Sequence, residues 1–129
     1  MEYPSVEKLV ELNLLALVVI RAKKADQPKV LSKAKLVAVL SECEKKEGDV
    51  FEKASCLLSG LVKAHAFASG NRRTAFLAMK YFLVINNAYP KVSDDPSNSK
   101  VMLGIREGYY SSDEIKEWIK YGKIREFKR

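Results

Sequence analysis

The only histidine of the chain, His65, opens the segment HAFASGNRRT. Further along the same segment an asparagine is followed by two arginines, Asn71, Arg72 and Arg73. A neutral imidazole, with an unperturbed pKa of about 6.5, can take a proton from an attacking hydroxyl. Arginine guanidinium groups bind phosphate oxygens two at a time. The segment therefore combines a candidate base with a candidate phosphate site, which suits phosphoryl or nucleotidyl transfer.

The elements that must position these residues are two helices joined by a short loop. Apolar residues at helical spacing predict one helix over about Val50–His65 and another over about Arg72–Asn86. The start of the second helix presents free backbone N–H groups and the positive end of a helix dipole, which favours an anion. We expect Phe67 to point into the core and hold the loop. Asn71 is short enough to cap the helix, and it can also reach a phosphate or a metal-bound water.

A structural interpretation of the same segment stays open at this point. In that interpretation the loop is an ordinary corner between two helices. His65 is then half-buried, and Arg72 and Arg73 are exposed without a ligand. An isolated histidine more often has such a structural role than a catalytic one.

Further helices are predicted elsewhere, and together they indicate an all-α fold. Ser5, Ser32 and the pair Ser111–Glu114 are candidate helix starts, the last as a capping box. The proline-containing segment at 22–32 is expected to be a loop or a small β-hairpin. A chain of 129 residues is long enough for one domain with its own core. We therefore predict a single all-α domain over residues 1–129. The expected helices cover about 5–21, 32–47, 50–65, 72–86 and 99–107, and a last helix runs from 111 to the basic tail at 121–129.

Composition and charge narrow the classes of function. No signal peptide is visible, and the longest apolar run, Leu14–Ile20, is much shorter than the roughly 20 residues of a membrane helix. We expect a cytoplasmic protein with no membrane role, and buried thiols at Cys43 and Cys56. The formal net charge of +7 fits anionic partners, but the positive charges are spread along the chain.

The motif residues together resemble the Fic/Doc family. The family motif reads His-x-Phe-x-(Asp/Glu)-Gly-Asn-(Gly/Lys)-Arg, and the following Thr-Ala is typical of the Doc branch. Four neighbouring segments are also similar to the family: Val30–Leu40, Glu52–Leu61, Phe82–Tyr89 and Gly108–Trp118. The matching motif residues are His65, Phe67, Gly70, Asn71, Arg73 and Thr74.

The resemblance implies a compact helical Fic fold and a transferase. Such enzymes move part of a nucleotide, usually AMP, onto a protein hydroxyl. Doc proteins instead pass a phosphate from ATP to a translation factor, and they are paired with a Phd-type antitoxin. By position, His65 is the base, and Gly70, Asn71 and Arg73 hold phosphates. Arg72 stands where Doc has a lysine.

Two positions bear on which branch of the family the chain resembles and on whether it can carry out transfer. The second arginine of the AMP-transferring branch falls at Phe76, which favours the Doc-like branch. The acidic residue that holds Mg²⁺ in the family falls at Ser69, whose neutral hydroxyl is a poor ligand for a hard cation. Magnesium binding is therefore expected to be weakened. Three alternatives remain open. Arg72 supplies the missing positive charge, the nucleotide itself holds the metal ion, or the protein keeps the fold and has lost the reaction.

Three functions follow from these observations. The first is a Doc-like transferase acting on a serine, threonine or tyrosine hydroxyl of a protein. The second is a degenerate enzyme that binds a nucleotide or a protein without transfer. The third, less favoured, is an RNA- or acidic-protein-binding module that uses the basic tail: Lys120, Lys123, Arg125, Lys128 and Arg129.

Three smaller features complete the expectations. Asp94 and Asp95 are expected to be solvated acids of a turn-rich loop, although they resemble a metal pair. Tyr109 and Tyr110 are expected to pack beside the last helix. By the family resemblance, residues 24–31 form a flap that docks the target chain as an added strand.

Overall fold

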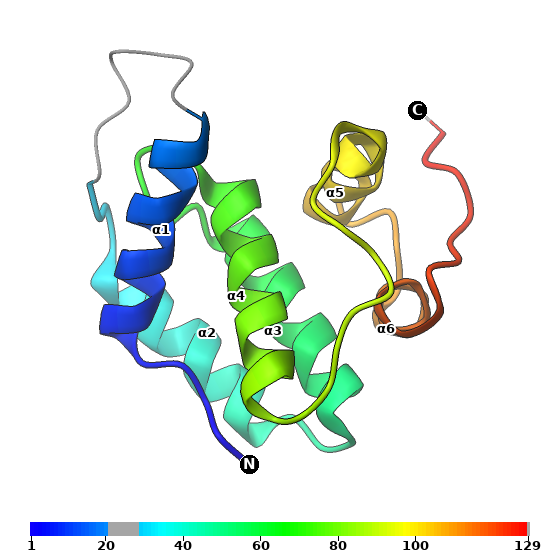
Figure 1. The fold of residues 1–129 in the computed structure, drawn as a ribbon, viewed down its shortest axis with the longest axis horizontal. Coiled ribbons are helices and arrows are strands. Elements are labelled where there is room, and N and C mark those ends of the chain that lie inside the picture. Colours follow the sequence, from blue (N-terminus) through cyan, green and yellow to red (C-terminus); the bar gives the residue numbers. More distant parts are fainter. Residues whose placement is uncertain (21–28, 129) are drawn as a thin grey trace.

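The computed structural model describes residues 1–20 and 29–128. These residues form helices and connecting loops without a β-strand, so the all-α prediction is confirmed (Figure 1). None of the described helices is long and apolar enough to cross a membrane. The elements are α1 (Val6–Ile20), α2 (Lys33–Lys45), α3 (Val50–Ala64), α4 (Asn71–Ile85), the 3-10 turn η1 (Pro96–Asn98), α5 (Ser99–Arg106) and α6 (Ser112–Tyr121).

Side-chain caps fix where these helices begin. The Ser5 hydroxyl accepts a hydrogen bond from the Lys8 N–H at 3.1 Å, and Ser32 caps α2 in the same way. Ser111 and Glu114 form the predicted capping box of α6. Each cap satisfies N–H groups that have no partner inside the first turn. The predicted starts of these helices are therefore confirmed.

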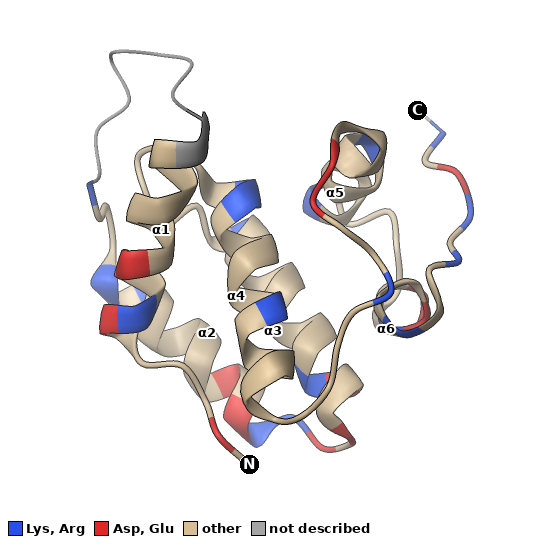
Figure 2. Ribbon diagram, viewed as in Figure 1, with Lys and Arg blue, Asp and Glu red and all other residues tan. Residues whose placement is uncertain are grey.

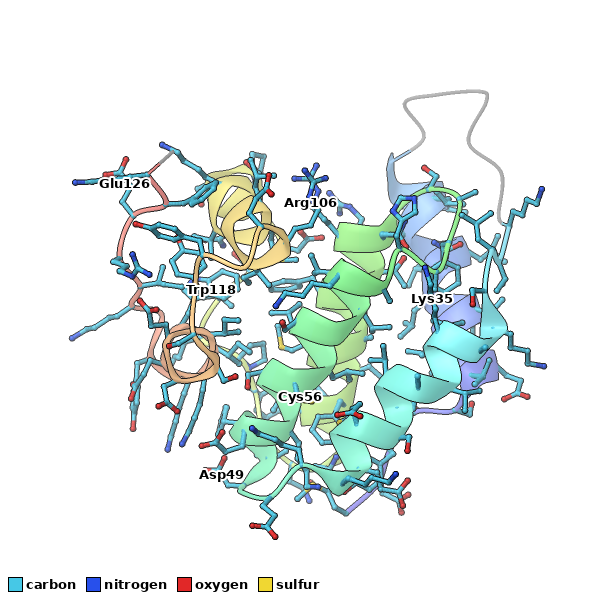
Figure 3. All side chains as sticks on the ribbon, turned by 180° about the vertical axis from the view of Figure 1, so that it is seen from behind. Lys35, Asp49, Cys56, Arg106, Trp118 and Glu126 are labelled. Carbon is cyan, nitrogen blue, oxygen red and sulfur yellow. The ribbon has the colours of Figure 1, made fainter. Side chains whose placement is uncertain are left out.

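Helices α3 and α4 lie side by side at the centre of the molecule. In Figure 1, α1 and α2 lie on one side of this pair and α5 and α6 on the other. The Trp118 indole is 2% exposed and lies among α3, α5 and α6 (Figure 3). It packs edge-on against the Phe76 ring of α4, with 6.4 Å between the ring centres. The buried core takes residues from all six described α-helices and from the C-terminal segment.

The end of the predicted flap lies against the motif loop. Val30 forms a single antiparallel bridge with Phe67. The Leu31 N–H donates to the Ala66 carbonyl at 2.7 Å, and the Ala68 N–H donates to the Lys29 carbonyl at 2.9 Å. The rest of the flap, and most of the hairpin predicted near 24–32, lies outside the described residues.

The basic C-terminal segment is tied to the rest of the fold. Phe127, 5% exposed, packs edge-on against Tyr109, and Tyr109 in turn packs on Tyr110. Arg125 forms an ion pair with Glu114 and lies 4.0 Å from the centre of the Tyr109 ring. Hydrogen bonding from Arg125 lowers the pKa of the Glu114 carboxyl to about 2. Both tyrosines thus pack against Phe127 of the C-terminal segment, and Arg125 connects Tyr109 to Glu114 on α6 and is engaged within the fold.

The two cysteines differ in burial. Cys43 is buried on α2, and burial raises the pKa of its thiol to about 12. Cys56 on α3 is only half-buried, so the prediction of two buried thiols holds for Cys43 alone. Cys56 lines a shallow groove between α2 and α3, where packing of these helices leaves its thiol partly open.

Candidate active site

Two residues in left-handed backbone conformation bracket the loop between α3 and α4. His65 follows the last residue of α3 with φ 49°, and Gly70 precedes α4 with φ 76°. A β-carbon at Gly70 would be strained by this φ and would lie 3.2 Å from Leu17 Cδ2. The structure therefore explains the glycine at this position, because the absence of a side chain lets the loop pass close to α1.

Phe67 and Asn71 fix the path of the loop. Phe67 is 2% exposed, which confirms that its ring points into the core. The Asn71 Oδ1 accepts from the Phe67 N–H at 3.1 Å, and the Asn71 Nδ2 donates to the Phe67 carbonyl at 2.8 Å. Asn71 is thus the first residue of α4 rather than its cap, and its side chain reaches back to the loop. Gly70 takes the cap position without a side-chain hydrogen bond.

Asn13, from α1, also holds the loop in place. Its side chain is 2% exposed and donates to the Ser69 carbonyl at 2.9 Å and to the Thr74 hydroxyl at 3.1 Å. Asn13 lies among the apolar residues of α1, and the sequence analysis assigned it no role. The sequence did contain a signal for this role, namely an amide side chain at a position among apolar residues. Buried polar groups are almost always hydrogen-bonded, so such an amide is expected to have partners in the core.

Replacing Asn13 with alanine should destabilise the fold by about 1–3 kcal/mol, because the Ser69 carbonyl and the Thr74 hydroxyl lose their donor. Urea unfolding followed by circular dichroism measures the loss. Glu11→Ala, on the exposed side of the same helix, is the matched control and should cost roughly 0.5 kcal/mol or less. Equal losses for the two variants would contradict the prediction.

His65 lies at the surface at the far end of the loop. Its ring is exposed, so the half-buried histidine of the structural interpretation is wrong. The His65 Nδ1 lies 3.3 Å from the Asn71 Nδ2. An amide nitrogen can only donate, so this contact fits the neutral tautomer in which Nδ1 accepts and Nε2 carries the proton. The contact links His65 to the first residue of α4.

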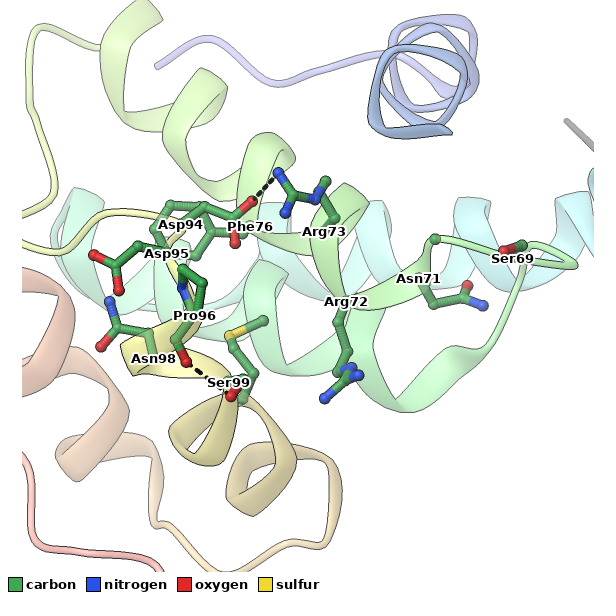
Figure 4. Close-up of a pocket in the computed structure, with 12 residues that line it drawn as sticks. Ser69, Asn71, Arg72, Arg73, Phe76, Asp94, Asp95, Pro96, Asn98 and Ser99 are labelled. Atoms are coloured by element: carbon green, nitrogen blue, oxygen red, sulfur yellow. Dashed lines mark hydrogen bonds and ion pairs between the residues drawn. The ribbon is translucent and has the colours of Figure 1, made fainter. Parts of the chain in front are cut away.

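The start of α4 opens onto a pocket of about 400 Å³. Figure 4 shows Arg72 and Arg73 pointing away from each other on the first turn of α4. The Arg73 Nη1 lies 3.1 Å from the Asp94 Oδ2. The pocket is lined by the first turn of α4 on one side and by η1 and α5 on the other: Ser69, Gly70, Asn71, Arg72, Arg73, Phe76, Asp94, Asp95, Pro96, Asn98, Ser99 and Met102.

The structure brings most of the predicted site residues together. Five of them, from Ser69 to Arg73, line this pocket, whereas His65 lies outside its lining. The prediction that Asp94 and Asp95 are both solvated is wrong for Asp94, whose Oδ2 is buried against Arg73. The Asp95 carboxylate instead accepts the Ser97 N–H at 2.9 Å and caps η1.

The charges around this pocket are of both signs. Figure 2 shows basic residues at the start of α4 and others scattered over the molecule, with acidic residues among them. The Ser69 carbonyl is held by Asn13. Within residues 1–20 and 29–128, no group of three or more histidine, cysteine, aspartate or glutamate side chains could hold a metal ion. The carboxylates in the pocket lining are those of Asp94 and Asp95.

Comparison with models of known protein families gives a match that includes the motif loop. Residues 21–83 match the model of the Fic/DOC family. Over these residues the chain is similar to the Fic/DOC family. The match covers α2, α3, the motif loop and almost all of α4, which carry His65 and the pocket-lining start of α4. No curated protein sequence matches the chain significantly.

Proposed function

We propose that the protein is a Doc-like transferase. It moves a phosphoryl group, or alternatively a nucleotidyl group, from a nucleoside triphosphate to a serine, threonine or tyrosine hydroxyl of another protein. ATP is the expected donor. The observation that carries the proposal is that the start of α4, with two arginines, opens onto a 400 Å³ pocket within a segment that matches the Fic/DOC family. The family match supports a Fic-type transferase in general.

The phosphates bind at the first turn of α4. The first N–H groups of a helix have no acceptor within it, and the helix dipole favours negative charge at this end. Gly70 lets the backbone approach the phosphates closely, and Arg72 and Arg73 supply guanidinium groups on either side. The Asn71 amide keeps the loop and the helix start in register through its two bonds to Phe67. Thr74 is a structural residue held by Asn13.

His65 is the base of the transfer. It takes the proton of the target hydroxyl while that oxygen forms a bond to the γ-phosphorus. The bond between the γ-phosphorus and the β-phosphate oxygen breaks, and ADP leaves with the electron pair. The incoming hydroxyl replaces the Asn71 amide at the His65 Nδ1, where the lone pair lies. This exchange costs little, because the contact is long and His65 is exposed.

Phe76 supports the Doc-like branch. Its ring lines the pocket, is 2% exposed and packs on Trp118, so it offers no second phosphate-binding cation at that position. A translation factor as target and a Phd-type antitoxin as partner belong to the same proposal. They follow from the branch assignment.

Magnesium is expected to bind mainly through the nucleotide phosphates. Ser69 is half-exposed at the pocket and offers a neutral hydroxyl. Ser69→Asp adds a carboxylate and should lower the Mg²⁺ concentration needed for half-maximal transfer about tenfold, which corresponds to ~1.4 kcal/mol. A titration of transfer against Mg²⁺ measures this effect. Ser69→Asn has the same size without the charge and serves as control; an equal shift in both variants would contradict the prediction.

A catalytically degenerate protein is the second candidate. Ser69 at the position of the family's acidic residue favours it, as does the Asp94 carboxylate that already pairs with Arg73. In this case the protein binds ATP or a protein partner and transfers nothing. Restoration of transfer by Ser69→Asp alone, from no activity in the unmodified chain, would favour this candidate.

The test of the proposal uses ATP labelled at the α- or at the γ-phosphate, incubated with Mg²⁺, the purified protein and a lysate of its host. Label transferred from the γ-phosphate to protein in a His65-dependent manner is the expected result. Label from the α-phosphate shows AMP transfer and rejects the Doc-like branch. Absence of label from both positions, with ATP still bound, supports the degenerate protein.

A further inference from the structure

Arg73, to which the proposed function assigns phosphate binding, already faces an anion. Its Nη1 lies 3.1 Å from the Asp94 Oδ2, and the two side chains are 35% and 28% exposed. Asp94 comes from the segment between α4 and η1, outside the family match. Figure 4 shows the ion pair at the edge of the pocket, with the Asp94 carboxylate turned toward α4. The carboxylate therefore occupies part of the guanidinium surface that a ligand phosphate needs.

The Asp94 side chain is weakly held compared with its neighbours. Its buried Oδ2 has no hydrogen-bond partner, so the contact with Arg73 is an ion pair without hydrogen-bond geometry. Burial removes the water that hydrates this oxygen, and without a hydrogen bond the protein does not fully compensate the desolvation free energy. A stronger anion can displace it at low cost.

The backbone on both sides of Asp94 is fixed without help from its carboxylate. The Ser93 hydroxyl donates to the Asp95 carboxylate at 2.7 Å. The Asn98 amide donates to the Ser93 carbonyl at 2.6 Å, and Asp95 caps η1. A turn of the Asp94 side chain away from Arg73 therefore leaves the loop in place.

We propose that Asp94 is an intramolecular competitor of the phosphate ligand at Arg73. In the unliganded protein its carboxylate neutralises Arg73. A polyphosphate binds when this carboxylate turns away, and the remaining negative charge of Asp94 still repels the bound phosphates. Asp94 thus sets the affinity of the pocket for a nucleoside triphosphate. The inference rests on the anion site of the proposed function and does not require transfer.

Binding of inorganic tripolyphosphate and of ATP, measured by isothermal titration calorimetry at fixed ionic strength, tests this role. Asp94→Asn should bind both ligands about five- to tenfold more tightly, since a partly exposed ion pair of about 1 kcal/mol no longer has to be broken. Glu117→Gln, which removes the same charge from an exposed position on α6, is the control and should change the affinity less than twofold. Unchanged or weaker binding by Asp94→Asn would overturn the inference.

Arg73→Gln separates competition at Arg73 from a general charge effect. In the Arg73→Gln background, Asp94→Asn should no longer tighten tripolyphosphate binding, because the competed group is gone. An equal gain in both backgrounds would overturn the inference. Asp94→Ser repeats the test with a smaller side chain, so that a folding defect of one variant does not decide the result. Tripolyphosphate has no nucleoside and needs no base, so this result stands or fails separately from His65-dependent transfer.

Discussion

Replacing His65 with alanine or asparagine is expected to lower the rate of transfer about 10²- to 10⁴-fold, the usual contribution of a positioned general base. His65 is the only histidine of the chain and lies beside the first residue of α4. Its ring is exposed, so the fold should lose little stability apart from the backbone strain that alanine meets at φ 49°. The measurement is the initial rate of label transfer from ATP at saturating donor, together with thermal unfolding of each variant.

The choice of asparagine controls for backbone strain at this position. His65 has φ 49°, and asparagine tolerates left-handed conformation better than most residues. A fall in rate with alanine but not with asparagine points to a displaced loop rather than to a lost base. ATP binding should stay within about twofold in both variants, because proton transfer and phosphate binding use different groups. Persistent transfer in both variants would reject His65 as the base.

The largest effect on stability is expected for Phe67→Ala. Phe67 is 2% exposed, and its backbone carries the bridge to Val30 and both hydrogen bonds to Asn71. Truncation of a buried phenylalanine costs about 3–5 kcal/mol, a large share of the roughly 5–15 kcal/mol that stabilises a domain. Because the ring anchors the motif loop, ATP binding should weaken even under conditions where the variant is folded.

Two further variants give this result its control. Phe67→Leu keeps an apolar side chain and should cost roughly 1–1.5 kcal/mol. Phe51→Ala removes a ring of the same size from the half-buried start of α3 and should cost about half as much as Phe67→Ala or less. Denaturant unfolding gives the free energies. A cost of Phe67→Ala no larger than that of Phe51→Ala would show that the loop is anchored by other contacts.

The helices and the motif loop were predictable because they depend on neighbouring residues. The capping hydroxyl of Ser111 meets an N–H three residues away, and an apolar stripe repeats every three or four residues. The end of one apolar pattern and the start of the next also placed Gly70 between two helices. The burial of Phe67 also followed, since an aromatic residue in a short loop between two apolar helices has the core beside it.

Local reasoning failed where two distant segments meet. Asn13 lies 56 positions before the Ser69 carbonyl that it holds, and no spacing rule connects them. Asp94 was expected to be solvated, but the fold of the segment after α4 brings its carboxylate to Arg73. Asn71 was a candidate cap, yet the tight turn at Gly70 directs its amide back to Phe67.

The sequence by itself determined the all-α class, the helix starts and the family motif with its candidate base and phosphate site. These features depend on side-chain type and on spacing within a few turns of helix. Only the tertiary structure decided the surroundings of that site: the support from α1, the exposed His65 and the carboxylate facing Arg73. Such contacts depend on how helices far apart in the chain pack against one another, and the free energy of that packing is spread over the whole core.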